Sequence, residues 1–95
     1  MISKDKVDFI INEAINEVLI NKDILIDKDK ITMEYSFIGS NSNIESIDIV
    51  QIISFVEDRL EDNGLPGIDL FEKTLQNDSL TFNQFSELII SELNS

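Results

Sequence analysis

The segment Ile44-Glu-Ser-Ile-Asp-Ile-Val-Gln-Ile-Ile-Ser-Phe-Val-Glu-Asp-Arg-Leu60 decides the fold expected for this chain. Its apolar residues recur at i, i+3, i+4, i+7 and i+11, which is the spacing of one helical stripe. The stripe consists of Ile49, Ile52, Ile53, Val56 and Leu60. Because a helix with such a stripe buries it against other elements, the segment predicts the central amphipathic helix of a helical domain.

Both ends of this helix are marked by residues that typically begin and end helices. Ser46 stands where an N-cap belongs, and Asp48 in the first turn suits the positive end of the helix dipole. Asn63-Gly64 is a typical C-terminal signal. We therefore expect a helix from roughly Ser46 to Asp62 with Ser46 as its cap.

The face opposite the stripe carries two apolar residues close to Ser46. At about 100° per residue, Ile47 and Val50 point away from the core and toward solvent. The rest of this outer face is polar to acidic and consists of Gln51, Ser54, Glu57, Asp58 and Glu61. A serine at a helix start is most often only a cap. A capping role alone does not explain the apolar pair or the acidic surface around it.

This segment resembles the attachment site of the acyl carrier protein family, in which Asp-Ser-Leu opens the second helix and an apolar and acidic recognition helix follows. The matching residues here are Glu45-Ser46-Ile47, and the family pattern continues through Asp48, Val50, Glu57 and Asp58. The segment departs from the family pattern in two ways, of which the first is chemically mild and the second suggests a divergent subgroup. Glu45 replaces the usual Asp, and Gly39 lies further upstream than the glycine of the common Gly-x-Asp-Ser-Leu form.

The resemblance implies a covalent cofactor and a set of partner enzymes. Ser46 would carry 4′-phosphopantetheine through a phosphodiester, with an acyl or aminoacyl cargo as a thioester at its tip. Partner recognition would fall to Glu45, Ile47, Asp48, Val50, Glu57 and Asp58. The first partner would be a phosphopantetheinyl transferase that uses coenzyme A, followed by loading and downstream biosynthetic enzymes. The placement has a physical basis, since a helix N-terminus offers free N–H groups to a phosphate. Fatty acyl, polyketide, aminoacyl and surface-glycan precursors all remain open as cargo.

A first helix is predicted from Ile2 to about Ile20. Its apolar residues recur at helical spacing: Val7, Ile10, Ile11, Ala14, Ile15, Val18 and Leu19. Ser3 is its expected cap, with Asp5 in the first turn. Phe9 lies at the border of the stripe.

The long connection from Asn21 to Asn43 is compatible with two structures, a β-strand or a loop packed against the bundle. The residues from Ile31 to Phe37 alternate between apolar and polar, which is a strand period. A lone strand is marginal in water, however. The family resemblance favours a first loop that places its apolar residues into the bundle, and an extended segment near Thr32–Tyr35 is compatible with that reading.

The last third of the chain predicts one short helix and one long one. The segment from Ile68 to Lys73 has room for one or two turns, with Leu70 and Phe71 inserted into the bundle. Thr81 and Gln84 form a capping box that begins the last helix, whose core residues would be Phe85, Leu88, Ile89 and Leu93. Asp78-Ser79-Leu80 repeats the family's tripeptide literally, but it lies just before this box, so we expect Ser79 to be a loop residue.

Composition excludes several classes of function. The 95 residues form one expected domain, 1–95, and the net charge of −12 disfavours nucleic acid and anionic membranes while favouring enzymes with basic docking patches. Cys and His are both absent, so the chain lacks the usual neutral-pH general base and the usual soft metal ligands, and we expect neither an enzyme nor a metal site. A calcium loop starting at Asp27 would have Ile31 and Ile38 at ligand positions and is rejected. No signal peptide or membrane span is apparent, which predicts a cytoplasmic location. We also expect a monomer.

The expected fold is therefore all-α, an acyl-carrier-protein-like four-helix bundle with three main helices, one short helix and a long first loop. Its expected function is that of a stand-alone carrier modified at Ser46. The alternative is a non-covalent acidic helical adaptor, which would use the exposed Ile47 and Val50 without modification of Ser46. A small hydrolase with Ser46 as nucleophile lacks a candidate base.

Overall fold

The computed structural model describes residues 3–20, 32–39, 44–65 and 69–94. These residues form four α-helices, one π-helical turn and a small antiparallel sheet. In chain order the elements are α1 (Lys4–Ile15), η1 (Asn16–Ile20), β1 (Ser36–Ile38), α2 (Ser46–Asp62), α3 (Leu70–Leu75), β2 (Leu80–Thr81) and α4 (Phe82–Leu93). The expectation of a mostly helical domain with three long helices and one short one is confirmed.

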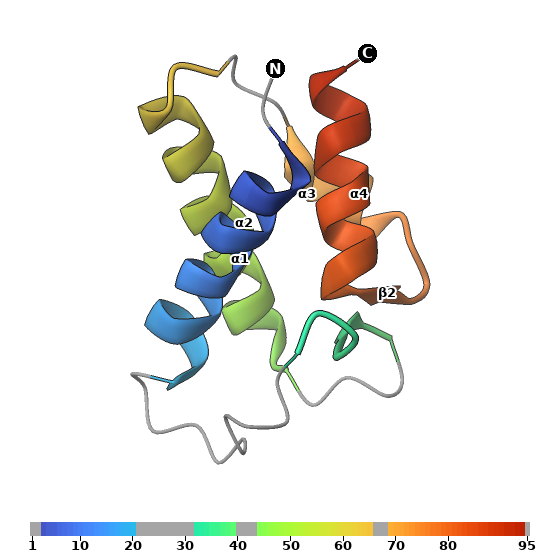
Figure 1. Ribbon diagram of the computed structural model, residues 1–95. Helices are drawn as coiled ribbons and strands as arrows, with labels where there is room; N and C mark the ends of the chain where they lie inside the picture. The colour runs from blue at the N-terminus through green and yellow to red at the C-terminus, as the bar shows by residue number, and fades with distance from the viewer. Residues whose placement is uncertain (1–2, 21–31, 40–43, 66–68, 95) are drawn as a thin grey trace.

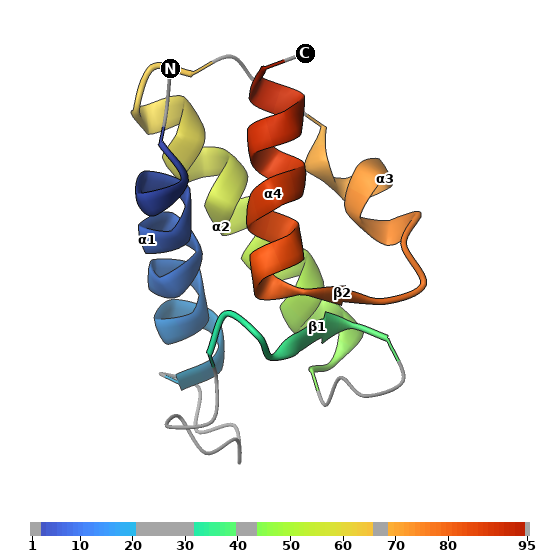
Figure 2. The same ribbon diagram turned by 45° about the vertical axis from the view of Figure 1, so that its right-hand side comes forward.

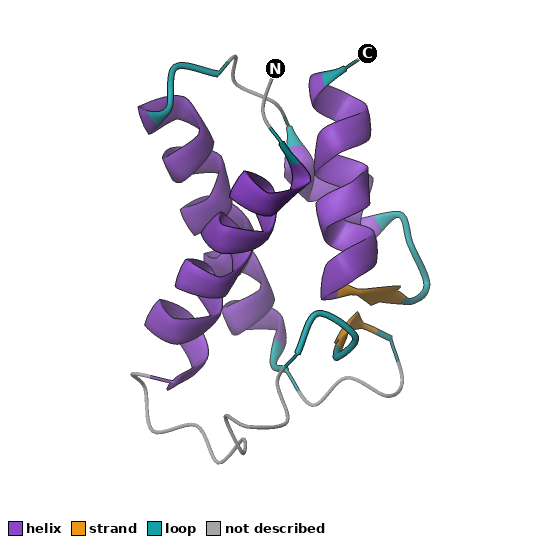
Figure 3. Ribbon diagram, viewed as in Figure 1, coloured by secondary structure: helices purple, strands orange, loops and turns teal. Residues whose placement is uncertain are grey.

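The three long helices pack side by side, and the short elements close the bundle. Helix α1 packs against both α2 and α4 and runs in the opposite direction to them (Figure 1). The short α3 packs against α2 and α4 and is seen beside α4 at the right of Figure 2. The two strands lie together at the end of the bundle where α4 begins (Figure 3).

Helix α1 follows its sequence pattern up to its last turn. The Ser3 side chain accepts a hydrogen bond from the Lys6 N–H at 3.2 Å, so the expected cap is confirmed. All of its predicted core residues are buried: Val7, Ile10, Ile11, Ala14, Ile15, Val18 and Leu19. The expected single helix is interrupted at Asn16, where a π turn begins. Val18 and Leu19, which α-helical spacing had already placed on the apolar stripe, remain buried in the π turn.

Helix α2 spans the predicted range and ends in a Schellman motif. The Leu65 N–H reaches back to the Leu60 carbonyl at 3.2 Å, and the Gly64 N–H reaches the Glu61 carbonyl at 2.9 Å. Gly64 has a φ of +78°, the left-handed conformation that glycine adopts without strain. On the core stripe Ile52, Ile53, Val56 and Leu60 are buried, and Ile49 is half-buried.

The described part of the first loop forms a strand, which begins later than the alternation of apolar and polar residues from Ile31 to Phe37 indicated. The segment near Thr32–Tyr35, where an extended conformation had been left open, is a turn closed by a hydrogen bond from the Tyr35 N–H to the Thr32 carbonyl at 3.0 Å. The strand begins at Ser36 and pairs with β2 from the distant loop before α4. This pairing supplies the neighbour that a lone strand lacks. Residues 21–31 and 40–43 lie outside the described part of the chain.

The loop also places apolar residues into the core, as the family resemblance predicted. Phe37 is fully buried, and its ring lies 4.9 Å from the rings of both Phe82 and Phe85, measured between centroids. Tyr35 and Met33 are half-buried against the same core. The loop therefore completes the hydrophobic core between its strand and the start of α4.

Helix α4 begins as predicted, whereas α3 begins at Leu70, two residues after the expected start. Asp69 caps α3 by accepting from the Glu72 N–H at 3.5 Å, and Leu70 is fully buried while Phe71 is half-buried. The capping box of α4 is present in both directions, with Thr81 and Gln84 exchanging hydrogen bonds at 2.9 and 3.1 Å. Along α4, Phe85 and Ile89 are buried, and Leu88 and Leu93 are half-buried.

Candidate functional site

Ser46 is the first residue of α2, and its side chain is exposed. The residue before it, Glu45, has an extended backbone (φ −71°, ψ 153°) and is the N-cap. The prediction that Ser46 caps the helix is therefore wrong, because a cap is the non-helical residue just before the first turn and Ser46 already lies within that turn. Its hydroxyl is consequently not engaged in capping, and it stands at the surface at the start of the helix.

Backbone N–H groups lie open beside this hydroxyl. The Asp48 and Ile49 N–H groups both donate to the Glu45 carbonyl at 3.0 Å. The N–H groups of Ser46 and Ile47 precede these first bonds and, within the described residues, have no acceptor in the helix. Together with the positive end of the helix dipole, they make the surface around Ser46 favourable for an anion.

Two exposed apolar side chains flank the serine. Ile47 is 62% exposed and Val50 is 41% exposed, as the helical rotation predicted. They lie on the solvent side of α2, opposite the fully buried Ile52, Ile53 and Val56. We call Ser46, Ile47 and Val50 the attachment surface.

Asp48 does not belong to this surface. Only 6% of it is exposed, which argues against its predicted role in partner recognition. Asp48 lies one turn before the fully buried Ile52, and residues four apart on a helix share a face. The Asp48 side chain therefore lies at the edge of the core stripe.

The two acidic residues further along α2 differ in environment. Asp58 is exposed and available to a partner, as is Glu45 at the helix start. Glu57 is half-buried, and its carboxylate accepts a hydrogen bond from the Leu70 backbone N–H. Burial raises the pKa of Glu57, the bond from Leu70 partly opposes this, and the negative charge of Asp69 adds to the rise. Glu57 thus connects α2 to the start of α3, a contact that the sequence pattern did not indicate.

The basic side chains of the described residues are all engaged within the molecule. Two lie near carboxylates and two lie over aromatic rings: Lys4 by Asp8 at 3.2 Å, Lys73 by Glu92 at 4.0 Å, Lys6 over Phe9 at 5.6 Å and Arg59 over Phe55 at 4.9 Å. The last two distances run to the ring centroid. Exposed carboxylates such as Asp58 and Glu61 therefore dominate the charge that α2 presents to a partner.

The literal Asp78-Ser79-Leu80 tripeptide lies in a different setting from Glu45-Ser46-Ile47. Ser79 is exposed but precedes α4 by three residues, in the loop position that was predicted for it. The N–H groups that open α4 are already engaged, Phe82 with the Tyr35 carbonyl at 3.2 Å and Asn83 with the Met33 carbonyl at 2.7 Å. The start of α4 therefore lacks the open donors found beside Ser46.

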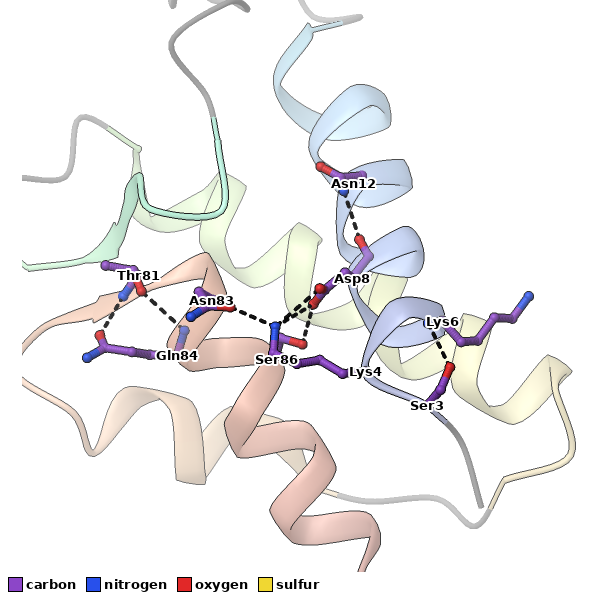
Figure 4. Close-up of polar contacts among 9 residues, drawn as sticks. All are labelled: Ser3, Lys4, Lys6, Asp8, Asn12, Thr81, Asn83, Gln84 and Ser86. Atoms are coloured by element: carbon purple, nitrogen blue, oxygen red, sulfur yellow. Dashed lines mark hydrogen bonds and ion pairs between the residues drawn. The ribbon is translucent and has the colours of Figure 1, made fainter.

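A polar cluster between α1 and α4 was not anticipated from the sequence. The fully buried Ser86 donates a hydrogen bond to Asp8, and the Lys4 ammonium contacts both Asp8 and the side-chain oxygen of Asn83, the latter at 2.7 Å (Figure 4). The available signal was a serine on the apolar stripe of α4, between Phe85 and Ile89. Because Ser86 is inaccessible to solvent, the cluster joins two helices and is not a nucleophilic site.

Known proteins and other parts of the described chain indicate no second function. The chain matches no protein-family model, no curated protein and no solved structure. Among the described residues, acidic side chains do not gather in a group of three that could hold a metal ion. Within the same residues, none of the helices is long and apolar enough to cross a membrane. The attachment surface is therefore the feature of the described residues that points to a function.

Proposed function

We propose that this chain is an acyl carrier protein that bears 4′-phosphopantetheine on Ser46. The observation that carries the proposal is the attachment surface. An exposed hydroxyl stands beside open N–H donors at a helix start, and two exposed apolar side chains lie next to it. A cap or core role explains neither feature, because Glu45 is the cap and Ile47 and Val50 face solvent.

Each part of the surface has a role in this proposal. The Ser46 oxygen forms the phosphodiester to the arm, which a phosphopantetheinyl transferase takes from coenzyme A. The helix N-terminus stabilises the phosphate charge. Ile47 and Val50 dock partner enzymes, and Glu45, Asp58 and Glu57 attract their basic patches. The thiol of the arm carries the acyl or aminoacyl cargo, so the chemistry belongs to the arm and to the partner enzymes.

The decisive experiment is modification in the presence of a broad-specificity phosphopantetheinyl transferase. We expect one mass increment on the intact protein, and peptide mapping should place it on Ser46. Ser46→Ala should abolish the increment, and because Ser46 is not the cap, it should lower stability by less than the ~0.5–2 kcal/mol of a lost N-cap. Ser79→Ala, in the literal Asp78-Ser79-Leu80 tripeptide, is the matched control and should leave the increment unchanged. Modification that moves to Ser79 would contradict the assignment.

Docking to the transferase can be tested separately from attachment. Val50→Glu should weaken binding by about tenfold or more, because it charges the apolar spot beside the serine. Leu75→Glu provides a control, since Leu75 is also exposed, at 54%, but lies on α3. Equal losses in both variants would show that the attachment surface is not the docking face.

The second candidate is a non-covalent acidic adaptor that binds a basic partner helix. The exposed Ile47 and Val50 and the engaged basic side chains favour it as well. It requires no covalent change at Ser46, so absence of an increment with several transferases would favour the adaptor over the carrier.

A further inference from the structure

The end of α2 holds the one Asn-Gly pair in the sequence, Asn63-Gly64. Both residues are exposed. At such a pair the glycine backbone nitrogen can attack the side-chain amide carbon of the asparagine and expel ammonia, forming a five-membered succinimide. Water then opens the ring to aspartate or isoaspartate. Glycine permits the fastest attack, because it has no Cβ to hinder the approach.

The folded helix end opposes this reaction at each reacting group. The Asn63 side-chain nitrogen, which would leave as ammonia, donates to the Arg59 carbonyl at 2.7 Å. The Gly64 N–H, which must lose its proton to attack, donates to the Glu61 carbonyl at 2.9 Å. The ψ angle of Asn63 is 11°, whereas ring closure requires the Gly64 nitrogen to rotate until it nearly eclipses the Asn63 Cβ.

We propose that Asn63 is a conformationally gated deamidation site. The Schellman end of α2 suppresses the reaction, and local opening of that end releases it. The inference does not depend on the proposed function, since neither Ser46 nor a cofactor takes part.

The product would prevent the helix end from closing as before. Deamidation places a carboxylate at the negative end of the helix dipole, next to Glu61 and Asp62. The isoaspartyl form also adds one carbon to the backbone within the motif that joins Leu65 to Leu60. A transient opening is thereby converted into a permanent change of charge and of backbone length.

Two other asparagines serve as internal controls. Asn77 at the end of α3 donates its side-chain nitrogen to the Lys73 carbonyl at 2.9 Å, and Asn12 within α1 donates to the Asp8 carbonyl at 3.0 Å. Both make the same contact as Asn63, with the carbonyl four residues earlier. They are followed by Asp78 and Glu13, so they differ from Asn63 in lacking a following glycine.

The test compares deamidation of the native protein with that of the protein unfolded in guanidinium chloride, in the same mildly alkaline buffer. Peptide mapping by mass spectrometry follows Asn63, Asn77 and Asn12 in each sample. In the unfolded protein we expect Asn63 to react about tenfold or more faster than the two controls. In the native protein its rate should fall by at least about tenfold, because reaction then requires opening.

The control variant Gly64→Ala is measured in the unfolded state, so its ability to fold does not matter. It should slow the reaction at Asn63 markedly, since the added Cβ hinders attack through the backbone nitrogen of residue 64. Equal rates for Asn63 in native and unfolded protein would overturn the gating. An Asn63 rate no greater than that of Asn77 in the unfolded chain would overturn the site itself.

Discussion

The ring of Phe37 stacks on the ring of Phe82, with centroids 4.9 Å apart and planes inclined by 22°. One ring comes from the first loop and the other from the first residue of α4, and both are fully buried. The loop is therefore part of the hydrophobic core, and its strand is held by packing as well as by pairing with β2.

Phe37→Ala should lower the free energy of unfolding by roughly 3–5 kcal/mol, the range for truncating a buried Phe. Phe9→Ala is the matched control, since Phe9 is 58% exposed, and should change stability by less than about 0.5 kcal/mol. Denaturation in urea measures both. If Phe37→Ala does not fold, Phe37→Leu should still lower the midpoint more than Phe9→Leu. Similar losses at the two positions would mean that the loop does not pack in the core.

Glu45→Asp should stabilise the protein by about 0.5–1 kcal/mol, because Asp is a good N-cap and the Glu45 side chain makes no capping bond. Asp69 shows the expected geometry at the start of α3, where it accepts from the Glu72 N–H. Glu45→Ala is the control and should have little effect on the thermal midpoint. A gain of the same size in both variants would point to removal of charge instead of capping.

Thr74→Val should raise the free energy of unfolding by roughly 1 kcal/mol. The Thr74 hydroxyl is buried and, within the described residues, has no hydrogen-bond partner, and valine keeps the shape while removing that polar group. Ser86→Ala is the opposite case, because it removes the donor to Asp8 and should lower stability by about 1–3 kcal/mol. If Thr74→Val instead lowers the free energy of unfolding, the Thr74 hydroxyl makes a hydrogen bond in solution.

Glu57→Gln should make the protein more stable at neutral pH, and the gain should shrink as the pH falls. The pKa of Glu57 is raised in the folded state, so the native protein binds this proton more tightly than the unfolded chain does. Its contribution to stability is therefore greatest below the ordinary Glu pKa of about 4.3 and is lost as pH rises through the folded pKa. Glutamine keeps an acceptor for the Leu70 N–H. Urea titrations of both proteins at several pH values measure the difference, and a gain that does not depend on pH would contradict the shift.

The helices could be predicted because their signals are local. The apolar stripe of α2, the Asn63-Gly64 end and the capping box of Thr81 and Gln84 each lie within a few residues of one another, so sequence order alone specifies them. The exposure of Ile47 and Val50 followed from the same helical rotation.

Two of the features that the sequence did not predict depend on residues far away in the chain. The third is a helix start that was placed one residue too late. The position of β1 is set by its pairing with Thr81, which no local alternation reveals. The bond from Leu70 to Glu57 depends on where α3 packs. The cap was misplaced by one residue, from Glu45 to Ser46, because serine is the commoner capping residue and the backbone angles were not known.

The hydrogen bond between Ser86 and Asp8 joins residues 78 positions apart, and it has a consequence for the order of folding. Helix α1 packs against α4 as well as against α2, so an emerging chain lacks one of these two partners until α4 has been synthesised. Contacts of such long sequence separation slow folding, because the intervening loop must close before they form. We therefore expect folding to wait for the synthesis of α4 and to be slower than in bundles whose neighbouring helices follow one another in sequence.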